Sequence, residues 1–150
     1  MPFVAWWPGR IKAGTVDSTS VLCGTDLLPT FCTLAGISIP ASVRPDGEDR
    51  SRALLGTPSA RSKTIFWEYG RNDSSFNYPK GRDRSPNIAL REGKWKLLMN
   101  ANGTDQQLYD LQTDPNENNN VYASQKEVAA LLEKKLLAWR RSLPSLLAAR

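Results

Sequence analysis

The chain has 150 residues, of which 40% are hydrophobic and 23% charged, and its net charge at neutral pH is +5. This composition is ordinary for a globular protein, and no apolar run approaches the roughly 20 residues that a membrane span needs, so we expect no membrane contact. The basic residues are scattered except around residues 71–84 and at the C-terminus, so the positive charge alone is weak evidence for an anionic partner.

Metal-binding and redox motifs are scarce. The chain has no histidine, and its two cysteines, Cys23 and Cys32, do not form a Cys-x-x-Cys pair, which argues against a zinc site. We interpret both cysteines as small apolar residues beside a helix rather than as a disulfide. The N-terminus shows no charged leader before an apolar region, so we expect no signal peptide in this chain.

Residues 3–7 are an apolar run closed by Pro8-Gly9, a pattern that predicts a strand ending in a turn. A strand that is apolar on both faces belongs inside a larger, helix-covered sheet. Nothing downstream of it within the first sixty residues offers a strand to pair with it. The sequence therefore predicts that its partners lie outside the chain.

Residues 25–36 predict a helix, with Asp26 or Thr25 as its N-cap, Pro29 in its first turn and Gly36 at its end. The predicted buried stripe consists of Leu27, Phe31 and Leu34. Residues 37–58 are rich in turn-forming residues and predict a connection with one helical turn at 51–55. We interpret Asp46-Gly47 within it as a turn rather than as a ligand-binding pair.

The C-terminal part predicts an antiparallel sheet of about four strands. Residues 64–69 are rich in β-branched and aromatic residues, and residues 87–111 show three apolar runs separated by Glu92-Gly93 and Asn102-Gly103. In the middle run, Trp95, Leu97 and Met99 share one face, whereas Lys94, Lys96 and Asn100 share the other.

A long helix is predicted for residues 124–143, opened by a Ser124–Glu127 capping box and stopped before Pro144. Its predicted apolar stripe consists of Val128, Leu131, Leu132, Leu136 and Trp139. This stripe can cover one face of the sheet, and Trp67, Trp95 and Trp139 are interpreted as core residues. The expected fold class of this unit is α+β.

Between the first two strands, residues 70–86 predict a long loop. It carries three cations, Lys80, Arg82 and Arg84, together with Phe76 and Tyr78. A long irregular segment in a compact domain often has a function, so we regard the three cations as candidate substrate-binding residues. A solvated loop, with its cations paired to nearby aspartates, is the alternative.

Several motifs occur together in a particular order. They are PFVAWWPGRIKAG, TDLLPTFCTLAGISIP, PDGEDRSRALLG, IFWEYG, NIALREGKWKLL and QLYDLQTDPNENNNV. Over residues 2–122 this order and spacing resembles the C-terminal part of the sulfatase family. The resemblance implies that residues 1–58 are the end of a large α/β domain like that of alkaline phosphatase. Residues 59–150 would then form the small C-terminal subdomain, a sheet with a long helix.

The resemblance also implies a chemistry. Sulfatases use a formylglycine made from the cysteine of a Cys-x-Pro-x-Arg motif, a calcium ion held by Asp and Asn side chains, and Lys and His residues around the sulfate. None of these can be placed in this chain, since neither cysteine fits the motif and histidine is absent. The expectation is therefore a sulfatase C-terminal fragment that is inactive alone and contains neither catalytic nor metal-binding residues.

Two alternatives belong to other classes. The chain could be a non-catalytic binding module for sulfated glycans that uses the basic loop as an anion site. A nucleic-acid binder is disfavoured, because basic residues interleaved with Phe76 and Tyr78 are not accompanied by any known motif. Sulfatases of this kind are commonly periplasmic or secreted, but the sequence itself does not indicate a location.

Overall fold

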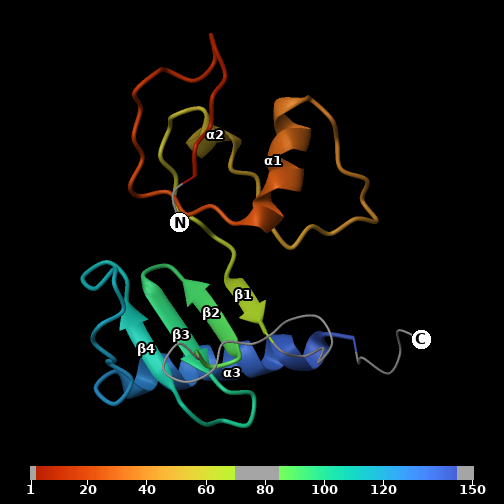
Figure 1. Cartoon of the computed structure of the whole chain (residues 1–150). Helices are drawn as coiled ribbons and strands as arrows, with labels where there is room; N and C mark the ends of the chain where they lie inside the picture. The colour runs from red at the N-terminus through yellow and green to blue at the C-terminus, as the bar shows by residue number, and fades with distance from the viewer. Residues whose placement is uncertain (1–2, 70–84, 145–150) are drawn as a thin grey trace. The chain divides into compact units, whose positions relative to one another are not determined.

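The computed structural model describes residues 3–69 and 85–144 (Figure 1). Internal contacts divide the chain into two compact units, residues 1–63 and 64–150, and each unit is described by itself. The assignment of residues 1–58 to a larger domain and of residues 59–150 to a small subdomain remains a prediction. No helix in the described ranges is long and apolar enough to cross a membrane.

The first unit contains three short helices: η1 (Gly24–Asp26), α1 (Leu27–Leu34) and α2 (Ser51–Leu54). The predicted helix and the predicted helical turn are thus confirmed. Helix α1 ends at Leu34, and Gly36, which follows its C-cap Ala35, has a φ of 68° in the left-handed region that glycine adopts without strain. The N–H of Ile37 then donates to the carbonyl of Cys32 at 2.8 Å, which satisfies one of the free carbonyls of the last turn.

Two details predicted for α1 are wrong. Phe31 is 54% exposed, and the residues that α1 buries are Pro29 and Thr30, because Thr30 accepts a hydrogen bond from the buried backbone of Arg50. Asp26 does occupy the N-cap position, as predicted, but its side chain makes no hydrogen bond to the first turn of α1, so the expected cap bond is absent. Its carboxylate accepts instead from other segments of the unit.

The predicted strand at residues 3–7 is absent. This segment has no strand pairing, and Val4 and Trp6 are 87% and 85% exposed. A strand exists only when a neighbouring backbone completes its hydrogen bonds, and residues 3–63 contain no strand. The prediction of a buried strand is therefore wrong for the chain as it stands here.

The second unit is a four-stranded antiparallel sheet in the order β1-β2-β3-β4, with α3 against it (Figure 1). Its elements are β1 (Ile65–Glu68), β2 (Ile88–Glu92), β3 (Trp95–Met99), β4 (Gln107–Asp110) and α3 (Lys126–Ser142). The predicted meander, its preceding strand and the long helix are confirmed, as is the α+β class. Positive φ angles of 56° at Gly93 and 84° at Gly103 lie in the two predicted turns.

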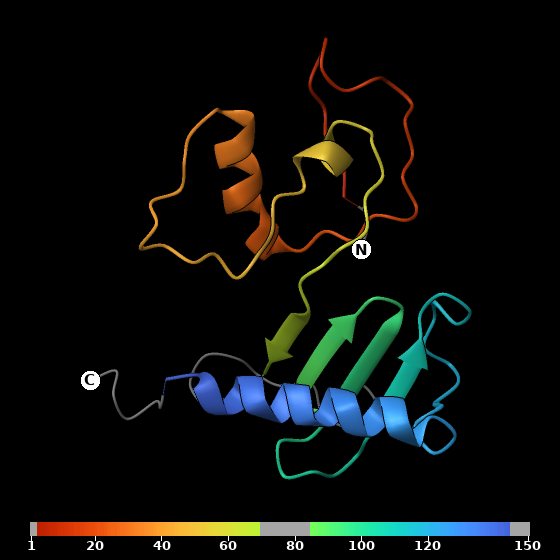
Figure 2. The ribbon, with the colours of Figure 1, turned by 180° about the vertical axis from the view of Figure 1, so that it is seen from behind.

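Helix α3 lies across one face of the sheet, as Figure 2 shows from behind. In the register of the sheet, Leu90 lies opposite Leu97, and Leu97 opposite Leu108. The fully buried core side chains on both sides of this interface are Ile88, Leu90, Leu97, Met99, Leu108 and Leu136. Trp139 of α3 stacks on Phe66 of β1, with ring centroids 4.8 Å apart. Burial of these side chains is the main stabilising term of this unit.

Two details predicted for α3 are wrong. Leu131 is 65% exposed, so it does not belong to the buried stripe. The helix begins one residue after Gln125, and the Ser124 hydroxyl donates to the carbonyl of Val121 rather than capping the helix. The predicted end before Pro144 is correct, because α3 ends at Ser142.

Candidate functional site

The predicted substrate-binding residues Lys80, Arg82 and Arg84 lie outside the described residues, so their role remains a prediction. The structure does describe both ends of their loop. The N–H of Tyr69 donates to the carbonyl of Asn87 at 2.8 Å, directly beyond the β1–β2 ladder. Residues 69 and 87 are therefore held side by side by the sheet.

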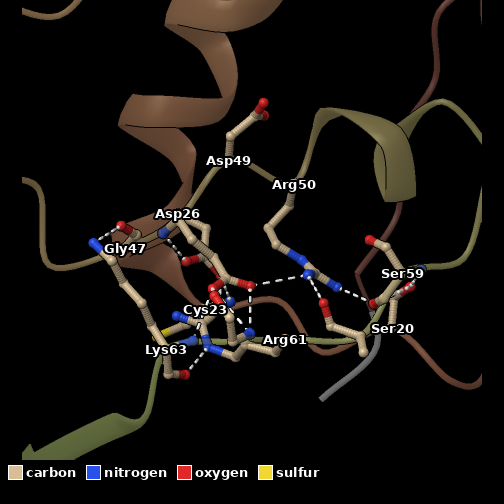
Figure 3. A network of polar contacts seen from close by, with 12 residues as sticks. Ser20, Cys23, Asp26, Gly47, Asp49, Arg50, Ser59, Arg61 and Lys63 are labelled. Carbon is tan, nitrogen blue, oxygen red and sulfur yellow. Dashed lines mark hydrogen bonds and ion pairs between the residues drawn. The ribbon is translucent and has the colours of Figure 1, made fainter.

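The most densely bonded polar group in the first unit surrounds Asp26, which is fully buried (Figure 3). Its carboxylate accepts hydrogen bonds from the backbone N–H of Cys23 at 2.7 Å and of Glu48 at 3.0 Å. Arg61 forms an ion pair with the same carboxylate. Asp26 thus joins the start of α1 to two segments that follow it in sequence.

A second buried ion pair extends this network. Arg50 is 2% exposed and donates to Glu48 at 2.9 Å and to the carbonyl oxygen of Ala60 at 2.7 Å. Its other terminal nitrogen donates to the carbonyl of Ser59. The ammonium of Lys63 closes the network by donating to Gly47 O at 2.7 Å (Figure 3).

The protonation of the two carboxylates follows from these contacts. Burial alone would raise the pKa of Asp26, but hydrogen bonds from Arg61 and from the backbone of Glu48 and Cys23 outweigh it and lower the pKa. Burial would likewise raise the pKa of Glu48, but hydrogen bonds from Ser62 and from the backbone of Lys63 outweigh it. The pKa of Glu48 is therefore also lowered. Both groups are charged at neutral pH, which does not suit a proton-transfer role.

The described residues do not fit the calcium ion that the resemblance to sulfatases implies. Within residues 3–69 and 85–144, no group of three or more His, Cys, Asp or Glu side chains could hold a metal. Asp26 is buried and Glu48 is half-buried. The oxygen atoms that a cation would need already accept hydrogen bonds from an arginine and from backbone N–H groups. Cys23 and Cys32 are free thiols and neither lies in a formylglycine motif. We interpret the network as a structural clamp.

Exposed apolar side chains gather on the first unit. A hollow of about 570 Å³ is lined by residues 3–7 together with Ile11, Phe31, Leu34, Ala35 and Leu54. Besides Val4 and Trp6, Phe3 is 54% exposed and Trp7 is 41% exposed. We call this set the apolar surface. Aromatic residues exposed together in this way are typical of an interface.

Sequence reasoning missed the clamp. Asp26 was assigned a capping role, and Glu48 and Arg50 were placed in a polar connection, where charged residues are usually solvated. Local sequence patterns do not predict the ion pair between Asp26 and Arg61, because these residues are far apart in sequence and meet only in the folded unit.

Comparison with known families decides the identity of the chain. The family described as "N-sulphoglucosamine sulphohydrolase, C-terminal" matches residues 1–142. The chain belongs to this family. It is therefore a C-terminal portion of a sulfatase, as the sequence motifs predicted.

Curated relatives are similar over most of the chain. An N-acetylglucosamine-6-O-sulfatase of Bacteroides thetaiotaomicron is 30% identical over 146 residues, covering 89% of this chain and 24% of that protein. Arylsulfatase A of Bos taurus is 31% identical over 149 residues, covering 85% of this chain and 27% of that protein. The chain thus spans about a quarter of the length of the curated relatives it matches.

Solved structures agree with the fold. The structure of BT4656 in complex with its substrate D-glucosamine-2-N,6-O-disulfate has a TM-score of 0.60 and 27% identity. That match covers 93% of this chain and 28% of BT4656. Ps i-CgsB in complex with k-i-k-neocarrahexaose has a TM-score of 0.64 over 89% of this chain, and its 22% identity supports the fold alone.

Proposed function

We propose that this chain is the C-terminal part of a sulfuric ester hydrolase that acts on sulfated saccharides. The observation that carries the proposal is the family match over residues 1–142, in a chain about one quarter as long as its sulfatase relatives. In the proposed enzyme, the nucleophile and the sulfate-binding residues belong to the part that precedes these 150 residues. The chain alone is inactive.

The proposed enzyme binds calcium outside the residues described here, among which no group of three or more His, Cys, Asp or Glu side chains could hold a metal. The role of residues 1–63 is to complete the larger domain. The apolar surface supports this role, because burial of Phe3, Val4, Trp6 and Phe31 against another part of the protein would remove their exposed area from water.

The proposed role of residues 70–84 is saccharide recognition. Guanidinium and ammonium groups form charge-assisted hydrogen bonds with sulfate and carboxylate groups, and the loop carries three of them at Lys80, Arg82 and Arg84. The support from the structure is the pairing of Tyr69 with Asn87, which holds the two loop ends together. A non-catalytic module for sulfated glycans, which would use the same basic loop as an anion site, is the second candidate.

The experiment compares sulfate release by this chain with sulfate release by the longer protein encoded with its upstream sequence. We expect none from the chain, and turnover of an aryl sulfate and of N-acetylglucosamine 6-sulfate by a longer protein that contains Cys-x-Pro-x-Arg. Replacing the cysteine of that motif by alanine should abolish turnover. Sulfate release by the chain alone would overturn the proposal. Saccharide binding by a longer protein that hydrolyses no sulfate ester would favour the binding module.

A further inference from the structure

A polar hollow of about 410 Å³ lies at the end of the sheet where β2 begins and β3 ends. It is lined by Asn87, Asn100, Ala101, Asn102 and Thr104, and we call it the amide pocket. Both views of the ribbon place the β3–β4 connection at the end of the sheet toward which β1 points (Figures 1 and 2). The amide pocket therefore lies at the end of the sheet where β1 ends and β2 begins.

Backbone groups fix the orientation of two amides. The N–H of Ala101 donates to the side chain of Asn87 at 2.9 Å, and the N–H of Asn87 donates to the side chain of Asn100 at 3.3 Å. A backbone N–H only donates, so the side-chain atom that faces it must be the amide oxygen. The NH₂ group of Asn100 then donates to the Thr104 hydroxyl at 3.0 Å.

Asn102 is oriented in the same way. Its oxygen accepts from the N–H of Thr104 at 3.2 Å and from the Thr104 hydroxyl at 2.8 Å. The NH₂ groups of Asn87 and Asn102 consequently have no hydrogen-bond partner within the described parts of the chain. Two pre-oriented donors line the pocket, and their orientation is maintained by bonds that a ligand does not need to break.

The chemistry of the lining points to an uncharged ligand surface. The five lining residues carry amides, one hydroxyl and one methyl group, and none is charged. A sulfate group is bound most strongly by cations, whereas NH₂ donors suit hydroxyl and carbonyl oxygens. The volume falls within the range of small-molecule pockets.

We propose that the amide pocket binds the hydroxyl or acetamido oxygens of a saccharide unit, with the NH₂ groups of Asn87 and Asn102 as donors. The saccharide is the substrate of the sulfatase, so the inference rests on the proposed function and adds a neutral subsite to it. Asn87 also accepts the N–H of Tyr69, so one residue joins this subsite to the base of the cationic loop. The amide pocket binds the uncharged hydroxyl or acetamido oxygens, and the anionic groups of the substrate are left to the proposed cationic residues.

The test replaces the NH₂ groups of Asn87 and Asn102 by carboxylate oxygens. The hydrogen bonds that their side-chain oxygens accept within the β3–β4 connection are kept. Asn87→Asp and Asn102→Asp each keep an oxygen for the backbone N–H and lose the NH₂ group. Asn118→Asp, at an exposed position in the β4–α3 connection, is the matched control for the added charge. The full 150-residue chain is titrated with N-acetylglucosamine, a neutral probe, while NMR follows the side-chain NH₂ signals.

We expect the NH₂ signals of Asn87 and Asn102 to shift on titration, and each aspartate variant to bind about two- to tenfold more weakly than the parent chain. The control should bind the sugar unchanged. All variants should keep the parent's melting temperature, because the turn bonds remain.

Three results would overturn the inference. The first is no shift of these signals at any sugar concentration, and the second is equal affinity of the parent and both aspartate variants. The third is an equal loss of affinity in the Asn118→Asp control, which would mean that the added charge alone weakens binding. Failure of the sulfatase proposal would appear separately, as a lack of sulfate release by the longer protein, and would leave this binding measurement unaffected.

Discussion

Gly47 lies directly against the backbone of Thr25: a Cβ atom at Gly47 would be 2.1 Å from the carbonyl oxygen of Thr25. This close approach brings the next residue, Glu48, near enough for its N–H to donate to Asp26 at 3.0 Å. The clamp around Asp26 therefore depends on the absence of a side chain at position 47. The sequence suggested only a turn at Asp46-Gly47.

Gly47→Ala should destabilise the first unit by about 1–3 kcal/mol, because the added methyl group meets backbone atoms that cannot rotate away. Urea unfolding followed by NMR signals of residues 20–63 measures the change. Gly24→Ala is the matched control, since a Cβ there meets nothing within 4 Å, and we expect it to stay within about 0.5 kcal/mol. Equal stability of the two variants would contradict the close approach.

Stability of the first unit should fall in acid. Because the pKa of Asp26 is lowered in the folded state, the charged carboxylate is favoured more in the folded state than in the unfolded state. The stabilisation is then fully present above the unfolded pKa of about 3.9 and is lost as the pH falls through the lower folded value. Glu48, whose pKa is also lowered, adds to the same loss.

Asp26→Asn should reduce the difference in unfolding free energy between pH 7 and pH 3, measured by urea titration. At pH 7 it should cost about 3–5 kcal/mol, because Arg61 loses its buried partner. Asp46→Asn removes the same charge at an exposed position and should change neither value appreciably. If Asp26→Asn left the pH dependence of the unfolding free energy unchanged, Asp26 would not be the source of the loss of stability in acid.

Helix α3 offers a matched pair of leucines. Leu136 is fully buried against the sheet, whereas Leu131 is 65% exposed. Leu136→Ala should destabilise the second unit by about 2–5 kcal/mol through lost burial and a cavity, and Leu131→Ala should change little. Thermal unfolding followed by circular dichroism measures both. A large effect at Leu131 would mean that it packs against a surface that the described residues do not provide.

The second unit was more predictable than the first, for a physical reason. Its strands and helix show periods of two and about 3.6 residues, and side chains such as Leu97 and Leu136 are buried by the same elements that these periods define. The two wrong predictions in this unit concern Leu131, at the margin of the apolar stripe, and Ser124, at the start of the helix. At such positions a shift of one residue changes the energy little.

The first unit follows a different logic. Its helices are short, and its order depends on contacts across many residues, such as Asp26 with Arg61 and Arg50 with Ser59. Local patterns predict neither pair. The candidate substrate residues could be named from the motif and the loop length, but the amide pocket could not, because residues 87 and 102 approach one another only through the register of β2 and β3.

The apolar surface should make the isolated chain self-associate. Exposed aromatic side chains that lack a partner bury their area against other molecules. Replacing Phe3, Trp6 and Phe31 together by Gln should shift the chain toward the monomer in sedimentation velocity at the same concentration. Leu131→Gln, which removes a single exposed apolar side chain elsewhere, should not. A monomeric parent chain would show that the surface drives no association by itself.

The cationic loop gives the last prediction, which concerns the complete enzyme. Tyr69 and Asn87, which flank this segment, are held side by side by a backbone hydrogen bond. We expect each of Lys80, Arg82 and Arg84 to donate one charge-assisted hydrogen bond to the saccharide. Replacing one of them by Ala should then lower kcat/KM for the natural sulfated glycan, by an amount that corresponds to about 1.5–3 kcal/mol of lost transition-state stabilisation. A small aryl sulfate, too short to reach the loop, should be hydrolysed almost as before. Unchanged kcat/KM for both substrates would identify the loop as a solvated connection, whereas an equal loss for both would show that it supports the fold or the chemistry, because recognition of the distant saccharide alone cannot affect the aryl substrate.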